Sequence, residues 1–137
     1  MTNKNMKEKY MEYQILMQQL QQLQQNISAL EKHIIDLRGL DDNLNSLSQT
    51  KINSETLMPL GSGIFLKGEL KDNKTVIMNV GNNVCVEKNM VEARDTVNKQ
   101  LEEVSIVLGQ LQEEVDNTAV KLNEMQSELQ SAKEEIE

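Results

Sequence analysis

The feature that most constrains the fold is a regular spacing of apolar residues in the N-terminal third of the chain. From Tyr13 onward they recur in alternating steps of three and four, at Leu16, Leu20, Leu23, Ile27, Leu30, Ile34 and Leu37. This spacing places one apolar stripe along a helix and is typical of a coiled coil. Beyond Leu37 the apolar residues continue at Leu40, Leu44 and Leu47, which predicts a local shift in the phase of the stripe.

A second stripe of the same kind covers nearly all of the C-terminal third. Its members are Val97, Leu101, Val104, Leu108, Leu111, Val115, Thr118, Leu122, Met125, Leu129, Ala132 and Ile136, of which only Thr118 is polar. The two stripes predict helices of similar length. Because a connector with close ends folds such helices back on each other, we expect an antiparallel two-helix coiled coil with Leu20 near Asn123.

Between the stripes, residues 57–88 consist of short apolar runs separated by turn residues. Gly61-Ser62-Gly63 and Gly81-Asn82-Asn83 each divide two such runs, which predicts two β-hairpins in series. Pro59 lacks a backbone donor, so its strand is expected to bend or to lie at an edge. Hairpins with unpaired edges and an uncovered apolar face are marginal alone, so we expect them to join this chain to other subunits.

The expected organisation is a single structural domain that is mainly α with a small amount of β. Residues 1–56 form the N-terminal coiled-coil helix, residues 57–88 form the two β-hairpins, and residues 89–137 form the C-terminal coiled-coil helix. The sequence has 14 Lys and Arg against 22 Asp and Glu, and its formal charge is -8. The acidic excess lies in the C-terminal helix.

Composition argues against several classes of function. A single Cys85 and a single His33 argue against a disulfide framework and the usual zinc ligand sets, so no metal is expected. The acidic balance argues against nucleic-acid binding, and no apolar run approaches the roughly 18 residues that span a membrane. We find no phosphate-binding glycine loop and no nucleophile with a histidine partner, so neither enzymatic activity nor a cofactor is expected. The polar N-terminus lacks the apolar region of a signal peptide, which indicates a cytoplasmic protein.

The N-terminal helix carries more apolar side chains than one stripe can hide. Met6, Tyr10, Met11, Ile15 and Met17 lie at mixed helical phases beside the stripe. One interpretation is that they thicken a local core or belong to a frayed helix end. The other is an adaptable surface for unlike apolar partners such as unfolded polypeptide, because methionine is flexible and polarizable.

The central third resembles the α class of the prefoldin family, in its archaeal form. The similarity is carried by Leu57–Gly68, Val76–Gly81 and Val84–Lys88, and the order of helix, two hairpins and helix agrees along the whole chain. The resemblance implies a hetero-hexamer in which two α-class and four β-class subunits build a platform of β-barrels from their hairpins. It also implies a chaperone that holds non-native proteins at the coiled-coil tips without ATP and passes them to a group II chaperonin.

The resemblance assigns residues to two surfaces. The client-binding tip is expected to contain Met6, Tyr10, Met11, Ile15, Leu129, Ala132 and Ile136. The oligomerisation platform is expected to contain Leu57, Leu60, Ile64, Phe65, Leu66, Val76, Ile77, Val80, Val84 and Val86. An alternative left open by the sequence is a structural coiled-coil subunit that forms filaments or scaffolds through its β-hairpins.

Overall fold

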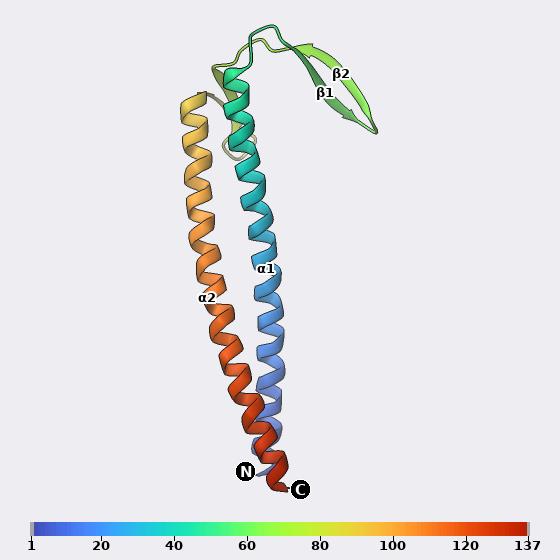
Figure 1. Ribbon diagram of the computed structural model, residues 1–137, viewed down its shortest axis with the longest axis vertical. Coiled ribbons are helices and arrows are strands. Elements are labelled where there is room, and N and C mark those ends of the chain that lie inside the picture. Colours follow the sequence, from blue (N-terminus) through green and yellow to red (C-terminus); the bar gives the residue numbers. More distant parts are fainter. Residues whose placement is uncertain (1, 137) are drawn as a thin grey trace. The chain divides into compact units, whose positions relative to one another are not determined.

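The computed structural model describes residues 2–136 of the chain, with side chains described as far as residue 134 (Figure 1). The elements in chain order are α1 (Asn3–Gln49), β1 (Glu55–Gly61), β2 (Ile64–Glu69), β3 (Thr75–Asn79), β4 (Cys85–Asn89) and α2 (Met90–Ile136). The expected fold of two long helices and two small β-hairpins is confirmed. Contacts divide the chain into two compact units, one of residues 1–34 with 103–137 and one of residues 35–102.

In the first unit the N-terminal part of α1 packs against the C-terminal part of α2. The predicted stripe residues from Tyr13 to Leu30 are all half-buried, and Ile34 is buried. On α2, Leu122 and Ala132 are buried, and the other stripe residues from Val104 to Leu129 are half-buried. The spacing of three and four therefore defines the contact between the helices, as the sequence predicts.

In the second unit the seam between the helices is more completely buried. Its core consists of Leu37, Leu44, Met90, Ala93 and Val97. Met90 and Ala93 extend the stripe of α2 back to the first turn of the helix. Val97 is only 2% exposed, so this part of the helix pair forms the tightest packing described in the chain.

The predicted phase shift after Leu37 is wrong, because a polar residue occupies the seam there. Leu40 is 44% exposed, whereas Asp41 is half-buried in the position that continues the heptad. Nε of Arg94 donates to Oδ1 of Asp41 over 2.9 Å, and Nη1 of Arg94 donates to Oδ1 of Asn45 over 3.1 Å. Asn98 also donates to Asp41, over 3.4 Å. The heptad therefore runs on through a polar layer as far as Leu44, beyond which the predicted Leu47, and not Ser48, is half-buried.

The register of the two helices also differs from the expected one. Leu20 was expected near Asn123, but Gln19 and Leu23 border the same surface hollow as Asn117 and Thr118. The expected register is therefore wrong by more than one helical turn. The ion pair between Lys9 and Glu128 agrees with the observed alignment.

The first hairpin pairs β1 with β2 in antiparallel fashion. Met58 lies opposite Leu66 and Pro59 lies opposite Phe65, and the register shifts between Pro59 and Gly61. This irregularity confirms the bend expected at Pro59, whose nitrogen cannot donate to the ladder. The turn is tight enough that Ser62 itself takes a positive φ of 49° between two glycines.

The second hairpin pairs β3 with β4 and leads directly into α2. Asn82 and Asn83 form its turn with φ of 51° and 60°, a left-handed conformation that asparagine tolerates better than most residues. Oδ1 of Asn89 accepts a hydrogen bond from the backbone N of Glu92 over 2.8 Å. Asn89 therefore caps α2 at the residue where the last strand ends.

Both helices are 47 residues long, and their outward faces are mostly polar. Glutamines dominate the exposed side of α1, and carboxylates dominate that of α2. Within residues 2–136, neither helix contains a stretch apolar enough to cross a membrane.

The seam assignment predicts different effects for two nearby leucines. Leu37 is 6% exposed and Leu40 is 44% exposed. We expect Leu37→Ala to lower the free energy of unfolding by about 2 kcal/mol, since it removes a buried side chain and leaves a cavity. The matched control Leu40→Ala should change it by less than about 0.5 kcal/mol. Thermal or urea unfolding followed by circular dichroism measures both, and equal effects would show that the heptad does shift after Leu37.

The polar layer predicts a pH-dependent contribution from Asp41. The hydrogen bond from Arg94 lowers the pKa of Asp41 below its ordinary value of 3.8. The ionised carboxylate therefore stabilises the fold above that pH, and its contribution is lost as the pH falls through the lowered pKa. We expect Asp41→Asn to be less stable than the natural chain at pH 7, with the difference in melting temperature shrinking below about pH 3.8. A constant difference from pH 7 to pH 3, as expected for the exposed control Asp36→Asn, would contradict this role.

Candidate functional site

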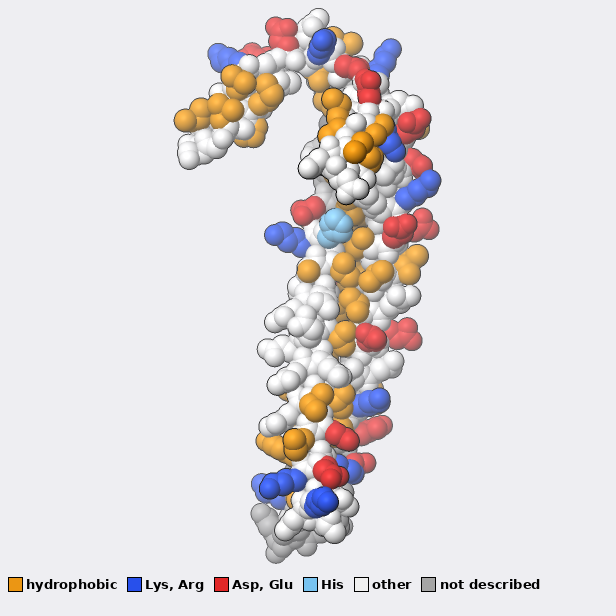
Figure 2. Space-filling view, turned by 180° about the vertical axis from the view of Figure 1, so that it is seen from behind, with side chains coloured by type: hydrophobic (Ala, Val, Ile, Leu, Met, Phe, Trp, Pro, Cys, Tyr) orange, Lys and Arg blue, Asp and Glu red, His pale blue; other side chains and the backbone are white. Residues whose placement is uncertain are grey.

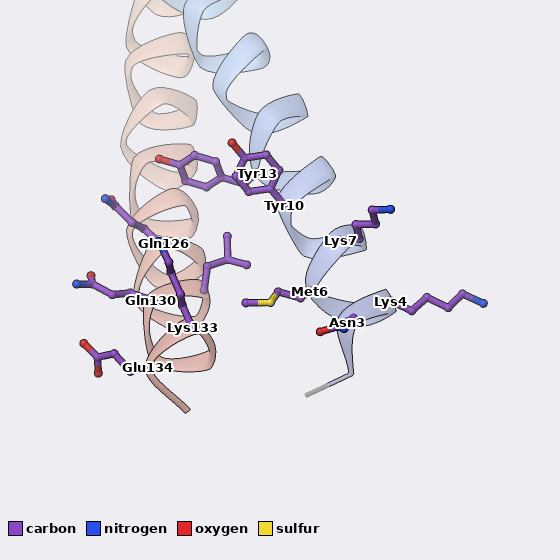
Figure 3. Close-up of a pocket in the computed structure, with 11 residues that line it drawn as sticks. Asn3, Lys4, Met6, Lys7, Tyr10, Tyr13, Gln126, Gln130, Lys133 and Glu134 are labelled. Carbon is purple, nitrogen blue, oxygen red and sulfur yellow. The ribbon is translucent and has the colours of Figure 1, made fainter. Parts of the chain in front are cut away.

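The ends of α1 and α2 in the first unit enclose an open groove, here called the tip groove, with a volume of about 1210 Å³ (Figure 3). From α1 it is lined by Asn3, Lys4, Met6, Lys7, Tyr10 and Tyr13, and from α2 by Gln126, Leu129, Gln130, Lys133 and Glu134. This volume exceeds the roughly 300–1,000 Å³ of a typical small-molecule pocket. The groove therefore has room for a segment of polypeptide.

The floor of the tip groove is apolar. The side chain of Met6 points from α1 toward α2, and the rings of Tyr10 and Tyr13 lie one and two turns further along (Figure 3). Deeper along the pair, Lys9 forms an ion pair with Glu128. This ion pair joins the two helix ends, while the apolar side chains beside it remain accessible from outside.

Further apolar side chains stand on the outward side of α1 next to the groove. Met11 is 61% exposed, Tyr10 55%, Ile15 53% and Met17 46%. They lie outside the stripe that α2 covers, so the helix pair leaves them in water. Four exposed apolar residues within about two turns near one end of α1 make this end a candidate interaction surface.

The predicted tip residues fall into three groups. Met6, Tyr10 and Leu129 line the tip groove, and Met11 and Ile15 stand exposed beside it. Ala132 is only 5% exposed because it packs in the seam, so it does not border an open patch as expected. The side chain of Ile136 lies outside the described residues.

Eight residues that line the groove were not predicted for it: Asn3, Lys4, Lys7, Tyr13, Gln126, Gln130, Lys133 and Glu134. Tyr13 is a stripe residue, and nothing in the spacing distinguishes it from the stripe residues that follow. The four residues on α2 are polar or charged, and their place beside Met6 depends on the helix register.

The two hairpins present a second apolar surface, here called the hairpin surface. Its exposed members are Leu57, Leu60, Ile64, Phe65, Leu66, Ile77, Val80, Val84 and Val86, and Val76 is half-buried. The most exposed is Ile77, at 76%. All ten residues expected in the platform thus belong to this surface, and their contact with other subunits stays a prediction.

The first hairpin is apolar on both of its faces. Residues opposite each other in an antiparallel pair share a face. Pro59 and Phe65 therefore share one face with Leu57, whereas Met58 and Leu66 share the other. Figure 2 shows the apolar side chains crowded on this hairpin. A two-stranded ribbon that exposes both apolar faces and both edges is marginally stable on its own and favours association.

Polar groups near the hairpins have structural explanations. Oδ1 of Asp72 accepts a hydrogen bond from the backbone N of Lys74 over 2.7 Å, and its other oxygen accepts from the hydroxyl of Thr75. These bonds lower the pKa of Asp72, with the largest effect from the Thr75 hydroxyl, and they fix the turn between the hairpins.

Cys85 is an exposed free thiol at the start of β4. Among the described residues, no three His, Cys, Asp or Glu side chains are grouped so as to hold a metal ion.

Comparison with known proteins gives concordant matches. A family model described as "Prefoldin subunit" matches residues 16–135. The prefoldin subunit alpha of Pyrococcus horikoshii is 31% identical over 134 residues, which cover 90% of this chain and 89% of the relative. That of Methanococcus aeolicus is 27% identical over 135 residues, which cover 98% and 92%.

A solved structure has the same fold. The cryo-EM structure of filamentous PFD from Methanocaldococcus jannaschii matches with a TM-score of 0.74 and 21% sequence identity, over 84% of this chain and 95% of that chain. The family match includes both hairpins and most of both helices, and the resemblance seen in the sequence is confirmed. The relatives' names denote a family of chaperones rather than of enzymes. This chain belongs to the prefoldin family.

Proposed function

We propose that this chain is the α-class subunit of a cytoplasmic chaperone that holds non-native polypeptides at the tip groove without ATP. Through its hairpins it joins β-class subunits, two α with four β, and the complex passes its clients to a group II chaperonin. Family membership supports the chaperone function. The exposed apolar surface at the tip supports its location on this chain.

The single observation that carries the proposal is the tip groove with its exposed rim. Non-native polypeptides differ from folded ones chiefly in the apolar side chains that they expose, and burying such surface contributes about 25 cal/mol per Å². Met6, Met11 and Met17 adapt their shape to unlike partners at little cost. The groove therefore suits many sequences loosely, which a holding chaperone requires.

The hairpin surface fits assembly better than client binding. Its apolar residues lie on strands whose edges have free backbone donors and acceptors, so a partner strand gains both hydrogen bonds and apolar contact. Such pairing is directional and selects partners with matching hairpins. The tip, in contrast, is helical, so its backbone groups are already hydrogen-bonded and a partner contacts its side chains.

Transfer to a chaperonin requires that the client be held weakly. Each half-exposed apolar contact contributes little to the affinity for the client. An apolar surface of similar affinity on the chaperonin can therefore compete for the client. The acidic outward face of α2, with Glu113, Glu114 and Asp116, suits electrostatic steering toward a basic patch on the docking partner.

The proposal assigns separate tasks to the two surfaces, so substitutions in one should impair only client binding and substitutions in the other should impair assembly. We expect Tyr10→Gln/Met11→Gln/Ile15→Gln to leave the mass of the complex with β-class subunits unchanged while weakening suppression of client aggregation. Each substitution removes roughly 1 kcal/mol of apolar contact, so the concentration for half-suppression should rise by about tenfold or more.

Phe65→Asp/Ile77→Asp should instead abolish assembly, since a buried unpaired charge costs several kcal/mol. Light scattering of a denatured model enzyme and mass measurement give the two readouts.

A matched control separates the tip from general surface apolarity. Ile106, Val107 and Val120 are exposed to 57%, 44% and 57% but lie on α2 away from the tip groove. Ile106→Gln/Val107→Gln/Val120→Gln should therefore suppress aggregation like the natural chain. Equal loss in both triple variants would contradict the tip assignment. Open-ended fibres rather than a closed complex in the mass measurement would favour the structural alternative.

A further inference from the structure

Lysines gather around the tip groove although the chain as a whole is acidic. Lys4, Lys7 and Lys133 line the groove, and Glu134 is the only carboxylate lining it among the described residues. The formal charge of the whole chain is -8. The lining therefore carries three positive groups and one negative group, although exposed Glu8, Glu12 and Glu128 lie on the same helix ends outside it.

The placement of these groups gives the groove two distinct rims. Lys4 and Lys7 extend from the α1 rim, away from α2, while Met6 lies between the helices (Figure 3). Glu134 points away from Met6 near the end of α2 (Figure 3). Within the described part of the chain, the ion pair at the tip joins Lys9 to Glu128, and the three lining lysines have no carboxylate within 4.0 Å.

We infer that the tip groove prefers non-native segments in which apolar side chains are flanked by aspartate or glutamate. The inference rests on the proposed function and specifies the class of client. Met6, Tyr10 and Leu129 take the apolar side chains, and the ammonium groups take the flanking carboxylates. Lysine suits this task because its long flexible stem follows a carboxylate whose position varies from client to client.

The acidity of α2 strengthens this preference by acting elsewhere on the same unit. Glu113, Glu114 and Asp116 are exposed and repel carboxylates from the side of the helix pair. A basic segment is attracted to these carboxylates on the side of α2 rather than to the groove. The lysine rim therefore favours acidic segments more than the side of α2 that carries Glu113, Glu114 and Asp116 does.

The preference is expected to be modest and sensitive to salt. Exposed ion pairs contribute little individually and are screened over a Debye length of about 8–10 Å at physiological ionic strength. Apolar contact thus supplies most of the affinity, and charge decides between clients of similar apolarity.

The test compares two labelled peptides with one apolar core of Leu and Phe, flanked by glutamates in one and by lysines in the other. Fluorescence anisotropy measures their binding to the full-length chain in its purified assembly. We expect the glutamate-flanked peptide to bind about five- to tenfold more tightly, as fits three weak ion pairs acting together. Lys4→Gln/Lys7→Gln/Lys133→Gln should remove this difference, as should 0.5 M salt, and the Lys→Arg version of the triple variant should keep it.

The control variant Lys32→Gln/Lys99→Gln/Lys121→Gln changes the net charge equally but alters no residue that lines the groove. It should keep the difference between the peptides. Equal binding of both peptides to the natural chain, or a loss of preference in this control, would overturn the inference and leave the holding function intact. Failure of both peptides to bind would instead overturn the proposed function together with the inference.

Discussion

The seam between α1 and α2 is the contact on which the other features of this chain depend. Apolar residues at steps of three and four bury one stripe of each helix, and everything outside that stripe remains in water. The helices have little other means of staying folded, because isolated helices depend on packing rather than propensity. The seam therefore also decides which apolar side chains are left over for binding.

The polar layer at Asp41 and Arg94 gives the seam its register. A purely apolar stripe tolerates sliding by a heptad, whereas a carboxylate at a seam position must find its donors. In the observed alignment, Arg94 and Asn98 of α2 both donate to Asp41 of α1, and Arg94 also donates to Asn45. In the first unit the ion pair of Lys9 with Glu128 fixes the alignment of the helix ends, and with it the residues that meet in the tip groove.

Much of this architecture can be predicted from the sequence. The stripes predict the seam because heptad spacing is a direct consequence of helix geometry, and the glycine and asparagine turns predict the hairpins because few residues accept a positive φ. The register could not be predicted, since it depends on side-chain partners across the seam, such as Asp41 with Arg94 and Lys9 with Glu128. The spacing of leucines also pointed to a phase shift at Leu40, because apolarity alone does not reveal that Asp41 has Arg94 as a partner across the seam. Ala132 is a member of the predicted stripe, so its spacing already indicated burial in the seam rather than a place in an open patch.

Mapping the residues that a client contacts tests most directly whether clients bind at the tip groove. Tyr10 and Ile106 are exposed to nearly the same extent, 55% and 57%, but only Tyr10 lines the tip groove. A photo-crosslinking amino acid at each position, illuminated in the presence of a denatured client, compares the two sites at equal accessibility. The account predicts strong crosslinking to the client from position 10 and little from position 106. Equal yields from both positions would show that the client does not distinguish the tip groove from any other exposed apolar residue.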